Sequence, residues 1–326
     1  MARSDLLVSL VKASKQGDQA AFQRTLEALI AEEHAKNHHI LADHLAQFLN
    51  NNSPNKGLLN SIPNEQVASL FYELTPRRNL KDLFLPQGVY EECTQLIQEH
   101  HRKDLLRSFN LEPRHRILLI GPPGNGKTSL AEALAYELLL PMFVIRYEGV
   151  IGSYLGETAN RVRSLLDYVR LHQCLLFLDE FDTLAKERGD IHDTGEIKRV
   201  VSSLLLQLDS LPSHVIVVTA TNHPELLDRA VWRRIQVRLT LPQPTRKLIE
   251  KWFFNFQGKI REPIGYEPRT LADRLYGKSY AELEEFCDDI LRKRALELPS
   301  SSFKHIITLK LKQLSSQAKP TKNTGV

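Results

Sequence analysis

One short segment limits what this chain can fold into more than any other. It is the loop Gly121–Thr128, which reads GPPGNGKT. It follows an apolar run, Ile117–Ile120, and leads into a helix-prone stretch, Ser129–Tyr136. A glycine-rich loop between a strand and a helix lets backbone N–H groups close around phosphate oxygens without a Cβ in the way. The helix that follows adds the positive end of its dipole. The segment therefore predicts an α/β fold with a phosphate-binding loop.

Individual positions of this loop have physical roles in such a site. Pro122 and Pro123 fix φ, so the loop loses little entropy when it becomes ordered. Lys127 can place a positive charge on the β- and γ-phosphates, and the Thr128 hydroxyl can ligate Mg²⁺. The other predicted nucleotide-binding positions are Gly121, Gly124, Asn125, Gly126 and Ser129. The alternative, a Gly-Pro turn with an incidental lysine, does not explain the flanking strand and helix patterns. We expect a nucleoside triphosphate to bind here.

Two further apolar runs end in polar residues. Leu175–Leu178 reads as a strand buried on both faces and is followed by Asp179 and Glu180. Asp179 is suited to hold Mg²⁺ through water, and Glu180 to polarise the attacking water. Val215–Ala220 reads as another buried strand, and Asn222 after it is suited to orient water against the γ-phosphate. The alternative for Asn222 is an ordinary turn residue.

A pair of arginines, Arg233 and Arg234, precedes the apolar-rich stretch Ile235–Leu241. Adjacent arginines usually form a solvated face. These two lie beyond Asn222, where a second protomer could receive them at its bound nucleotide. An arginine supplied in trans contributes roughly 10³–10⁵ in rate in enzymes of this kind.

Together these segments resemble the AAA subgroup of the AAA+ ATPases, over about residues 80 to 295. By this resemblance, the loop from Gly121 is the Walker A motif and the strand that leads to Glu180 is the Walker B motif. Asn222 is similar to sensor 1, and Arg233 and Arg234 resemble the paired arginine fingers. The resemblance implies ATP hydrolysis with Mg²⁺, a parallel sheet flanked by helices, and a hexameric ring with ATP at the subunit boundaries.

A further segment resembles the first pore loop of polypeptide-remodelling members of this family. It is Ser153–Glu157, in which Tyr154, Leu155 and Gly156 match an aromatic, aliphatic and glycine pattern. An aromatic side chain on a flexible loop can grip polypeptides of any sequence through apolar contact. The alternative is a surface tyrosine packed on its own loop. The segment therefore predicts a polypeptide substrate.

Composition, helical patterns and the family resemblance together divide the chain into five parts. Residues 1–52 read as three short helices that form an N-terminal helical domain, which either recruits a substrate or packs on the ring. Residues 53–79 read as a linker. We expect the large α/β ATPase domain at 80–243 and a small helical lid at 244–314. Residues 315–326 are polar and basic, and are expected to be a disordered tail.

Two segments are expected near the nucleotide because they resemble family regions that approach it. Gly88 and Val89 fall in the region that wraps the adenine, although an ordinary loop is the alternative. Ala281 falls in Gly277–Ala281, which resembles the lid motif. Tyr280 stands where that motif has its middle glycine, so its contact is left open.

Composition excludes several classes of protein. The contents of 42% hydrophobic and 25% charged residues are those of a globular protein. No apolar run approaches the roughly 18 residues of a membrane span, and the first residues lack the apolar core of a signal peptide. The net charge of +4 and the lack of a basic, aromatic stripe argue against a nucleic-acid partner. Three scattered cysteines suit a reducing cytoplasm.

These features favour an ATP-driven machine that remodels, unfolds or threads a protein substrate. The alternatives are an NTPase acting on nucleic acid and a nucleotide-gated assembly scaffold. No His-Glu-x-x-His motif is present, so proteolysis would need another chain. The stretch from Glu187 to Leu206 resembles a group of single-ring bacterial AAA ATPases. Some of these are encoded beside a subtilisin-like serine protease in pairs implicated in phage defence, so such a protease is an expected partner.

Overall fold

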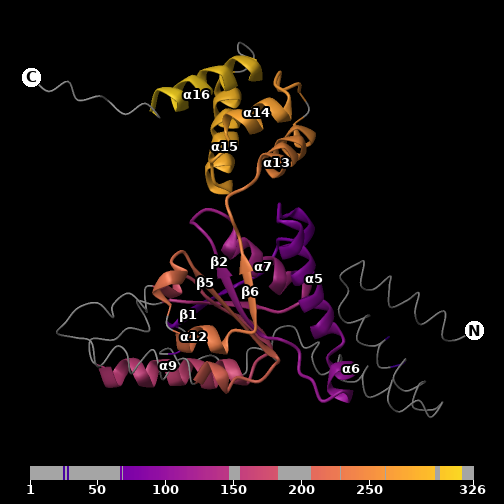
Figure 1. Cartoon of the computed structure of the whole chain (residues 1–326), viewed down its shortest axis with the longest axis vertical. Helices are drawn as coiled ribbons and strands as arrows, with labels where there is room; N and C mark the ends of the chain where they lie inside the picture. The colour runs from indigo at the N-terminus through magenta and orange to yellow at the C-terminus, as the bar shows by residue number, and fades with distance from the viewer. Residues whose placement is uncertain are drawn as a thin grey trace, which may run out of the picture. The chain divides into compact units, whose positions relative to one another are not determined.

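The computed structural model divides the chain into two units, residues 1–68 and 69–326. It describes residues 69–146, 155–182, 207–227, 229–260, 262–297 and 302–317, together with the single positions 25, 28 and 67. The predicted N-terminal helical domain therefore lies outside the described residues except at two positions. Figure 1 shows the described elements, most of them with the labels used below.

The second unit is built on a six-stranded sheet in the order β1-β3-β4-β5-β2-β6. The strands are β1 (Phe71–Leu74), β2 (Arg116–Ile120), β3 (Met142–Ile145), β4 (Cys174–Leu178), β5 (Val215–Thr221) and β6 (Val237–Thr240). Strands β2 to β6 pair in parallel, and only β1 is antiparallel to its neighbour β3. The predicted α/β fold with a parallel sheet is confirmed, with one antiparallel edge strand added. This strand lies within the stretch predicted as a linker, whose other boundaries stay predictions.

The described helices complete the unit. They are α5 (Gln87–His101), α6 (Lys103–Ser108), α7 (Lys127–Glu137), α9 (Leu155–Arg170), α12 (Arg229–Arg234), α13 (Arg246–Lys259), α14 (Pro268–Arg274), α15 (Tyr280–Leu296) and α16 (Phe303–Gln317). Two short 3₁₀ turns, η1 (Leu80–Asp82) and η2 (Pro224–Leu226), lie between them. No helix in the described ranges is long and apolar enough to cross a membrane.

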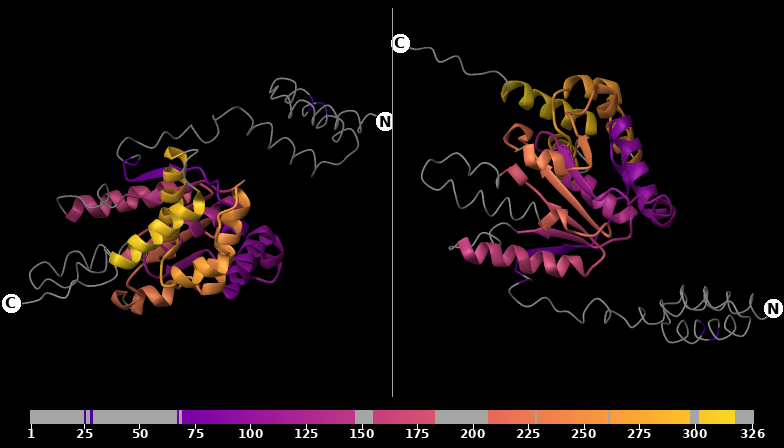
Figure 2. Two further views of the ribbon diagram at one scale, coloured as in Figure 1. Left: turned by 90° about the horizontal axis from the view of Figure 1, so that it is seen from above. Right: turned by 60° about the horizontal axis from the view of Figure 1, so that its bottom comes forward.

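Helices cover both faces of the sheet, because successive side chains of a strand point to opposite faces. Met142 and Val144 join the core formed with α5 and α7. Phe143, between them, contacts Tyr168 of α9 with ring centroids 6.2 Å apart. Figure 2 shows α9 and α5 on opposite sides of the sheet. Every residue of β4 and β5 is buried for this reason.

The C-terminal helices α13 to α16 form a separate bundle, which Figure 1 shows beyond the sheet edge where β6 ends. It has its own hydrophobic cluster, which includes Phe253 of α13, Leu271 of α14, Phe286 of α15 and Ile306 of α16. The predicted helical lid falls on this bundle. Residues 315–317 of the predicted tail belong to α16, and residues 318–326 lie outside the described part of the chain.

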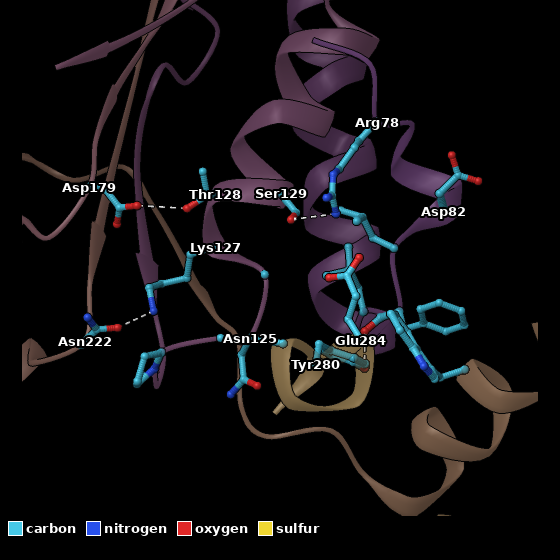
Figure 3. Close-up of a pocket in the computed structure, with 18 of the residues that line it drawn as sticks. Arg78, Asp82, Asn125, Lys127, Thr128, Ser129, Asp179, Asn222, Tyr280 and Glu284 are labelled. Carbon is cyan, nitrogen blue, oxygen red and sulfur yellow. Dashed lines mark hydrogen bonds between the residues drawn. The ribbon is translucent and has the colours of Figure 1, made fainter. Parts of the chain in front are cut away.

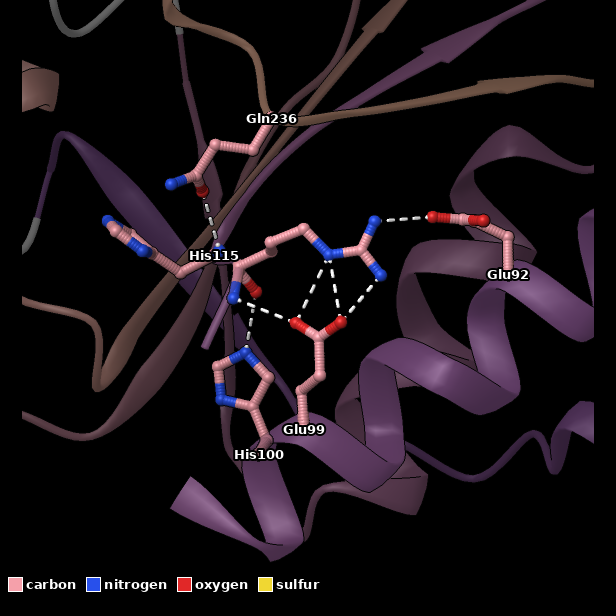
Figure 4. A network of polar contacts seen from close by, with 6 residues as sticks. Glu92, Glu99, His100, His115 and Gln236 are labelled. Atoms are coloured by element: carbon pink, nitrogen blue, oxygen red, sulfur yellow. Dashed lines mark hydrogen bonds and ion pairs between the residues drawn. The ribbon is translucent and has the colours of Figure 1, made fainter. Parts of the chain in front are cut away.

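A polar network fixes α5 to the beginning of β2 (Figure 4). Arg114 donates to both oxygens of Glu99 and, from Nη1, to Glu92 at 2.6 Å. The Nε2 of His100 lies 2.8 Å from the backbone oxygen of Arg114. Burial acts to raise the pKa of Glu99, but the bonds from Arg114 outweigh it and lower this pKa. Burial lowers the pKa of His100. The network lies at the opposite end of β2 from the glycine-rich loop.

Candidate active site

The glycine-rich loop leaves the sheet between two neighbouring strands that end beside it. The N–H of Gly121 donates to the oxygen of Thr221 in β5, and the N–H of Leu241 donates to the oxygen of Ile120. A Cβ at position 121 would lie 2.1 Å from the backbone oxygen of Leu241. Glycine is required here because the backbone after β6 passes so close.

Two further glycines of the loop adopt backbone angles that other residues rarely take. Gly124 has a φ of 75° and Gly126, the N-cap of α7, has a φ of 83°. A Cβ at Gly124 would lie 2.9 Å from the hydroxyl of Ser279, and the oxygen of Gly124 accepts a 3.0 Å hydrogen bond from the N–H of Ala281. The glycine-rich loop is therefore in direct contact with the start of α15, in the segment Gly277–Ala281 that resembles the lid motif.

Lys127, the first residue of α7, turns back across the loop. Its ammonium group donates to the backbone oxygens of Gly121 and Pro122, at 2.7 and 3.1 Å, and to Oδ1 of Asn222 at 2.6 Å. Burial lowers the pKa of Lys127, and the nearby carboxylates of Asp179, Asp182 and Glu180 act in the opposite direction. The structure thus brings the predicted lysine and the predicted asparagine into direct contact.

The carboxylates after β4 stand beside the same helix. The hydroxyl of Thr128 donates to Oδ2 of Asp179 at 2.9 Å, and the backbone N–H of Glu180 donates to Oδ1 of Asp179 at 2.9 Å. Glu180 has a φ of 46°, a left-handed conformation that costs a non-glycine residue about 1–3 kcal/mol. Its side chain is exposed and lines the pocket described below. The strained turn presents the Glu180 carboxylate to a solvent-accessible space.

A third carboxylate, Asp182, was not among the predicted site residues. It is buried, and its Oδ1 accepts from the Thr221 hydroxyl at 2.9 Å and from the N–H of Asn222 at 3.3 Å. Asp182 therefore fixes the end of β5 and the position of Asn222. The available signal in the sequence was an acidic residue shortly after Glu180, next to the buried Phe181.

Residues 123–129 of the loop and α7, together with Asp179, Glu180 and Asn222, form one wall of a pocket of about 740 Å³ between the sheet and the helical bundle (Figure 3). The other walls come from the segment before α5 and from α13 and α15. Their lining residues are Arg78, Asp82, Leu83, Phe84, Leu85, Trp252, Asn255, Lys259, Tyr280, Ala281 and Glu284. Arg78 also donates from Nη1 to the hydroxyl of Ser129 at 3.1 Å. The pocket thus joins the predicted phosphate loop to the predicted lid.

Gly88 and Val89 do not line this pocket, so the structure does not support their assignment to the adenine. Both lie in the first turn of α5, where Val89 packs against the hydrophobic core. The chain reaches the pocket a few residues earlier, at Asp82–Leu85. Sequence alone does not show where this segment turns away from the pocket, and which residues contact the adenine stays a prediction.

The donors and acceptors of the pocket fit a triphosphate with a hard cation. Asn125 is only 3% exposed, yet neither its amide nitrogen nor its amide oxygen has a partner among the described residues. Buried polar groups are normally paired, so this side chain has a donor and an acceptor left for a ligand. Thr128 and Asp179 offer oxygens, the ligands that Mg²⁺ prefers. In the described ranges, no three His, Cys, Asp or Glu side chains converge on one point.

The two predicted arginine fingers differ in their surroundings. Arg234 at the end of α12 forms an ion pair with Asp209, which also accepts from Nη1 of Arg116 at 2.8 Å. Arg233 is exposed and has no ion-pair or hydrogen-bond partner among the described residues. Neither arginine lines the pocket of its own chain.

The predicted pore loop is described only in part. Tyr154 lies outside the described residues. Leu155 and Gly156 begin α9, and the structure does not describe their side chains.

Comparison with known proteins gives the family that the sequence motifs resemble. Residues 117–243 match the model of the ATPase family associated with various cellular activities (AAA). A protein of Sinorhizobium fredii named "Uncharacterized AAA family ATPase y4kL" is 35% identical over 303 residues, which cover 91% of each chain.

Two relatives with shorter matches have more specific names. The "Cell division cycle protein 48 homolog" of Archaeoglobus fulgidus is 35% identical over 191 residues, 56% of this chain and 26% of the relative. The "26S proteasome regulatory subunit 8 homolog" of Encephalitozoon cuniculi is 29% identical over 221 residues, 64% of this chain and 56% of the relative. The matches thus span about a quarter of the Archaeoglobus fulgidus protein and about half of the Encephalitozoon cuniculi protein. With a glycine-rich loop, a matching family model and a relative aligned over nearly its whole length, this chain belongs to the AAA family of ATPases.

Proposed function

We propose that the chain binds ATP with Mg²⁺ in the pocket between the glycine-rich loop, the segment before α5 and the helical bundle, and hydrolyses it to ADP and phosphate. One observation supports this most directly. The bond from Lys127 to Asn222 and the bond from Thr128 to Asp179 gather a cation, an amide and a carboxylate around one glycine-rich loop. Membership of the AAA family supports ATP hydrolysis, and this arrangement indicates which residues carry it out.

Each of these side chains has a proposed task. Lys127 exchanges its bonds to the loop oxygens for bonds to the β- and γ-phosphates, while the loop N–H groups hold the phosphate oxygens. Thr128 and Asp179 would hold Mg²⁺, which neutralises charge on the phosphates when bound. Glu180 polarises a water molecule, and Asn222 orients it.

The bonds and the proton of the chemical step can be assigned as follows. The water oxygen forms a bond to the γ-phosphorus, and the bond from that phosphorus to the bridging oxygen of ADP breaks. Glu180 accepts the proton of the attacking water and later releases it to phosphate or solvent. The electron pair of the broken bond stays on the ADP oxygen.

Two substitutions test this assignment. Lys127→Ala should abolish ATP binding, because the lysine contacts phosphate in the ground state. Glu180→Gln should bind ATP but scarcely turn over, because this carboxylate acts mainly on the attacking water. ATP affinity and phosphate release should be measured for both variants, and normal turnover by Glu180→Gln would remove this residue from the proposed mechanism.

We also propose that the chain forms a hexameric ring that remodels polypeptides. The names of relatives that include a proteasome regulatory subunit support a protein substrate, as does the sequence pattern at Tyr154. Unfolded protein, rather than DNA, should stimulate phosphate release; stimulation by DNA alone would favour the alternative of an NTPase acting on nucleic acid. The serine-protease partner, the role in phage defence and the cytoplasmic location are proposals from sequence alone.

The polypeptide proposal has a matched pair of variants. Tyr154→Ala should keep basal ATPase activity and assembly but lose stimulation by unfolded protein. Tyr154→Phe should retain both, because the proposed grip is apolar and does not use the hydroxyl. Assembly is measured first by light scattering. If Tyr154→Ala assembles and is stimulated normally, the threading model fails and the scaffold alternative gains support.

A further inference from the structure

The beginning of α15 is held rigidly by its own sequence. The hydroxyl of Ser279 accepts from the N–H of Glu282, and the Glu282 carboxylate accepts from the N–H of Ser279 at 2.8 Å. Lys278 adds a 2.8 Å bond to the same carboxylate. This reciprocal capping box fixes where the helix starts. As a result, Tyr280 occupies the first helical position in a defined orientation.

From that position, the side chain of Tyr280 reaches a part of the chain nearly two hundred residues earlier. Its hydroxyl donates a 2.6 Å hydrogen bond to the backbone oxygen of Phe84. Burial raises the pKa of the Tyr280 hydroxyl far above its ordinary value. The group therefore stays protonated and can act as a donor at neutral pH. The bond joins the helical bundle directly to the segment before α5.

Aromatic contacts reinforce this bond. The ring of Phe84 lies 5.1 Å from that of Trp252 in α13 and 6.3 Å from that of Tyr280, and the rings of Trp252 and Tyr280 are 5.6 Å apart. Such separations are within the range of favourable aromatic pairs. Trp252 and Tyr280 also pack against the hydrophobic cluster of the bundle. A movement of the bundle away from the segment before α5 must therefore separate this aromatic trio.

The trio lines the pocket, away from its charged residues. Figure 3 shows Lys127, Asn222 and Asp179 on one side and Tyr280 on the other. With the phosphates at Lys127, the base of the nucleotide would extend toward Tyr280. The Tyr280–Phe84 bond thus crosses the boundary between the bundle and the large domain at the end where the base would lie.

We propose that Tyr280 is a positioning residue that latches the helical lid against the base end of the nucleotide pocket. The proposal rests on the ATP site proposed above. The tyrosine that replaces the glycine of the lid motif lets this chain hold the pocket closed around a bound nucleotide. Loss of the hydroxyl should weaken nucleotide binding without changing the chemistry at the γ-phosphate.

The test uses Tyr280→Phe, which removes the hydrogen bond and keeps the ring. Tyr266→Phe is the matched control, because the Tyr266 hydroxyl bonds to Thr308 within the bundle, at 2.9 Å. The chain has two tryptophans. With Trp232→Phe in every variant, the fluorescence of Trp252 reports on the trio itself. ADP is the binding probe, because it has the same base as ATP and is not hydrolysed.

We expect Tyr280→Phe to bind ADP about 2- to 12-fold more weakly than its parent, the range for one neutral hydrogen bond. The KM for ATP should rise by a similar factor while kcat stays within about twofold, as expected for an interaction that holds the ground state and transition state equally. The emission of Trp252 before ADP is added should also change. Tyr266→Phe should match the parent in all three measurements.

The possible outcomes separate the two proposals. If Tyr280→Phe has the ADP affinity, KM and Trp252 emission of its parent, the latch is wrong and the ATP site stands. If kcat falls while the affinity is unchanged, the latch is also wrong. If the parent itself binds neither ADP nor ATP, the proposed function fails.

Discussion

Lys127 and Asn222 are joined by a 2.6 Å hydrogen bond from Nζ to Oδ1, although they come from different segments of the fold. Lys127 begins the helix after β2, and Asn222 follows β5, the neighbouring parallel strand. Parallel strands bring their carboxyl ends to one edge of the sheet, where ligands commonly bind in folds of this type. This bond and the bonds to the oxygens of Gly121 and Pro122 hold the ammonium group against the glycine-rich loop.

Replacement of Asn222 should affect turnover more than binding. In Asn222→Ala, Lys127 keeps its bonds to the loop oxygens, so we expect ATP affinity within about threefold of the parent chain. Phosphate release should fall about 100-fold, the scale for losing one preorganised polar group that acts in the transition state. Equilibrium binding and single-turnover hydrolysis measure the two effects separately. An equal loss in both would mean that Asn222 serves only to place Lys127.

Asp182 should act on the same step indirectly. Asp182→Ala leaves the buried Thr221 hydroxyl without its acceptor, which should lower the free energy of unfolding by about 1–3 kcal/mol. It should also slow turnover, because the N–H of Asn222 loses its partner. Asp182→Asn keeps an acceptor oxygen at this position and is the matched control. Asp182→Ala should have a lower free energy of unfolding, measured by chemical denaturation, and slower phosphate release than Asp182→Asn.

Much of this site was predictable because its residues follow buried apolar strands. Leu175–Leu178 is apolar, and Val215–Ala220 is apolar except for Thr219, because both faces of the sheet are covered. Polar residues therefore stand out at the ends of these strands. The glycine-rich loop was predictable for a related reason. Its function requires backbone angles and close approaches that only glycine allows, so the requirement is visible in the sequence.

Other features depend on contacts that a linear pattern does not contain. β1 has four residues, of which Tyr72 and Glu73 are exposed, and only its pairing with β3 identifies it as a strand. The role of Asp182 depends on its side chain meeting Thr221 of the neighbouring strand. The contact of Tyr280 joins segments far apart in the sequence. In each case tertiary packing, and not local preference, decides the structure.

The two arginines of α12 should respond differently to replacement. Arg233→Ala should change the free energy of unfolding by no more than about 0.5 kcal/mol, because an exposed side chain without partners contributes little. Its ATPase activity should fall about 10³-fold or more if it acts on the nucleotide of a neighbour. Arg234→Ala breaks the ion pair with Asp209 and should cost about 1 kcal/mol of stability.

A mixing experiment shows whether Arg233 acts between subunits. Arg233→Ala subunits have an intact Lys127, and Lys127→Ala subunits have an intact Arg233. Mixed rings therefore contain interfaces with both groups, and some phosphate release should return. If assembly of the mixture is verified and no ratio restores activity, Arg233 acts within its own chain or has no part in hydrolysis.

The free energy of unfolding should decrease at acidic pH, because Glu99 and His100 in the network with Arg114 become protonated. The pKa of Glu99 is lowered in the folded chain from an ordinary value of 4.5, and that of His100 from 6.5. In both cases the unfolded chain binds the proton more readily, so protonation favours unfolding. The contribution of His100 to the free energy of unfolding should be complete above about pH 6.5 and decrease as the pH falls below it. The contribution of Glu99 should be complete above about pH 4.5 and decrease as the pH falls further.

Two variants separate these groups in urea unfolding measured from pH 7.5 to 3.5. In His100→Asn, the free energy of unfolding should depend less on pH just below pH 6.5. It should still decrease below about pH 4.5, because Glu99 is still protonated there. Glu99→Gln should lower the free energy of unfolding at pH 7 by about 1–3 kcal/mol, since Arg114 loses a charged, bidentate partner. The difference in free energy of unfolding between Glu99→Gln and the parent should become smaller as the pH falls below 4.5. A deficit that stays constant down to pH 3.5 would show that Glu99 contributes through packing and not through its charge.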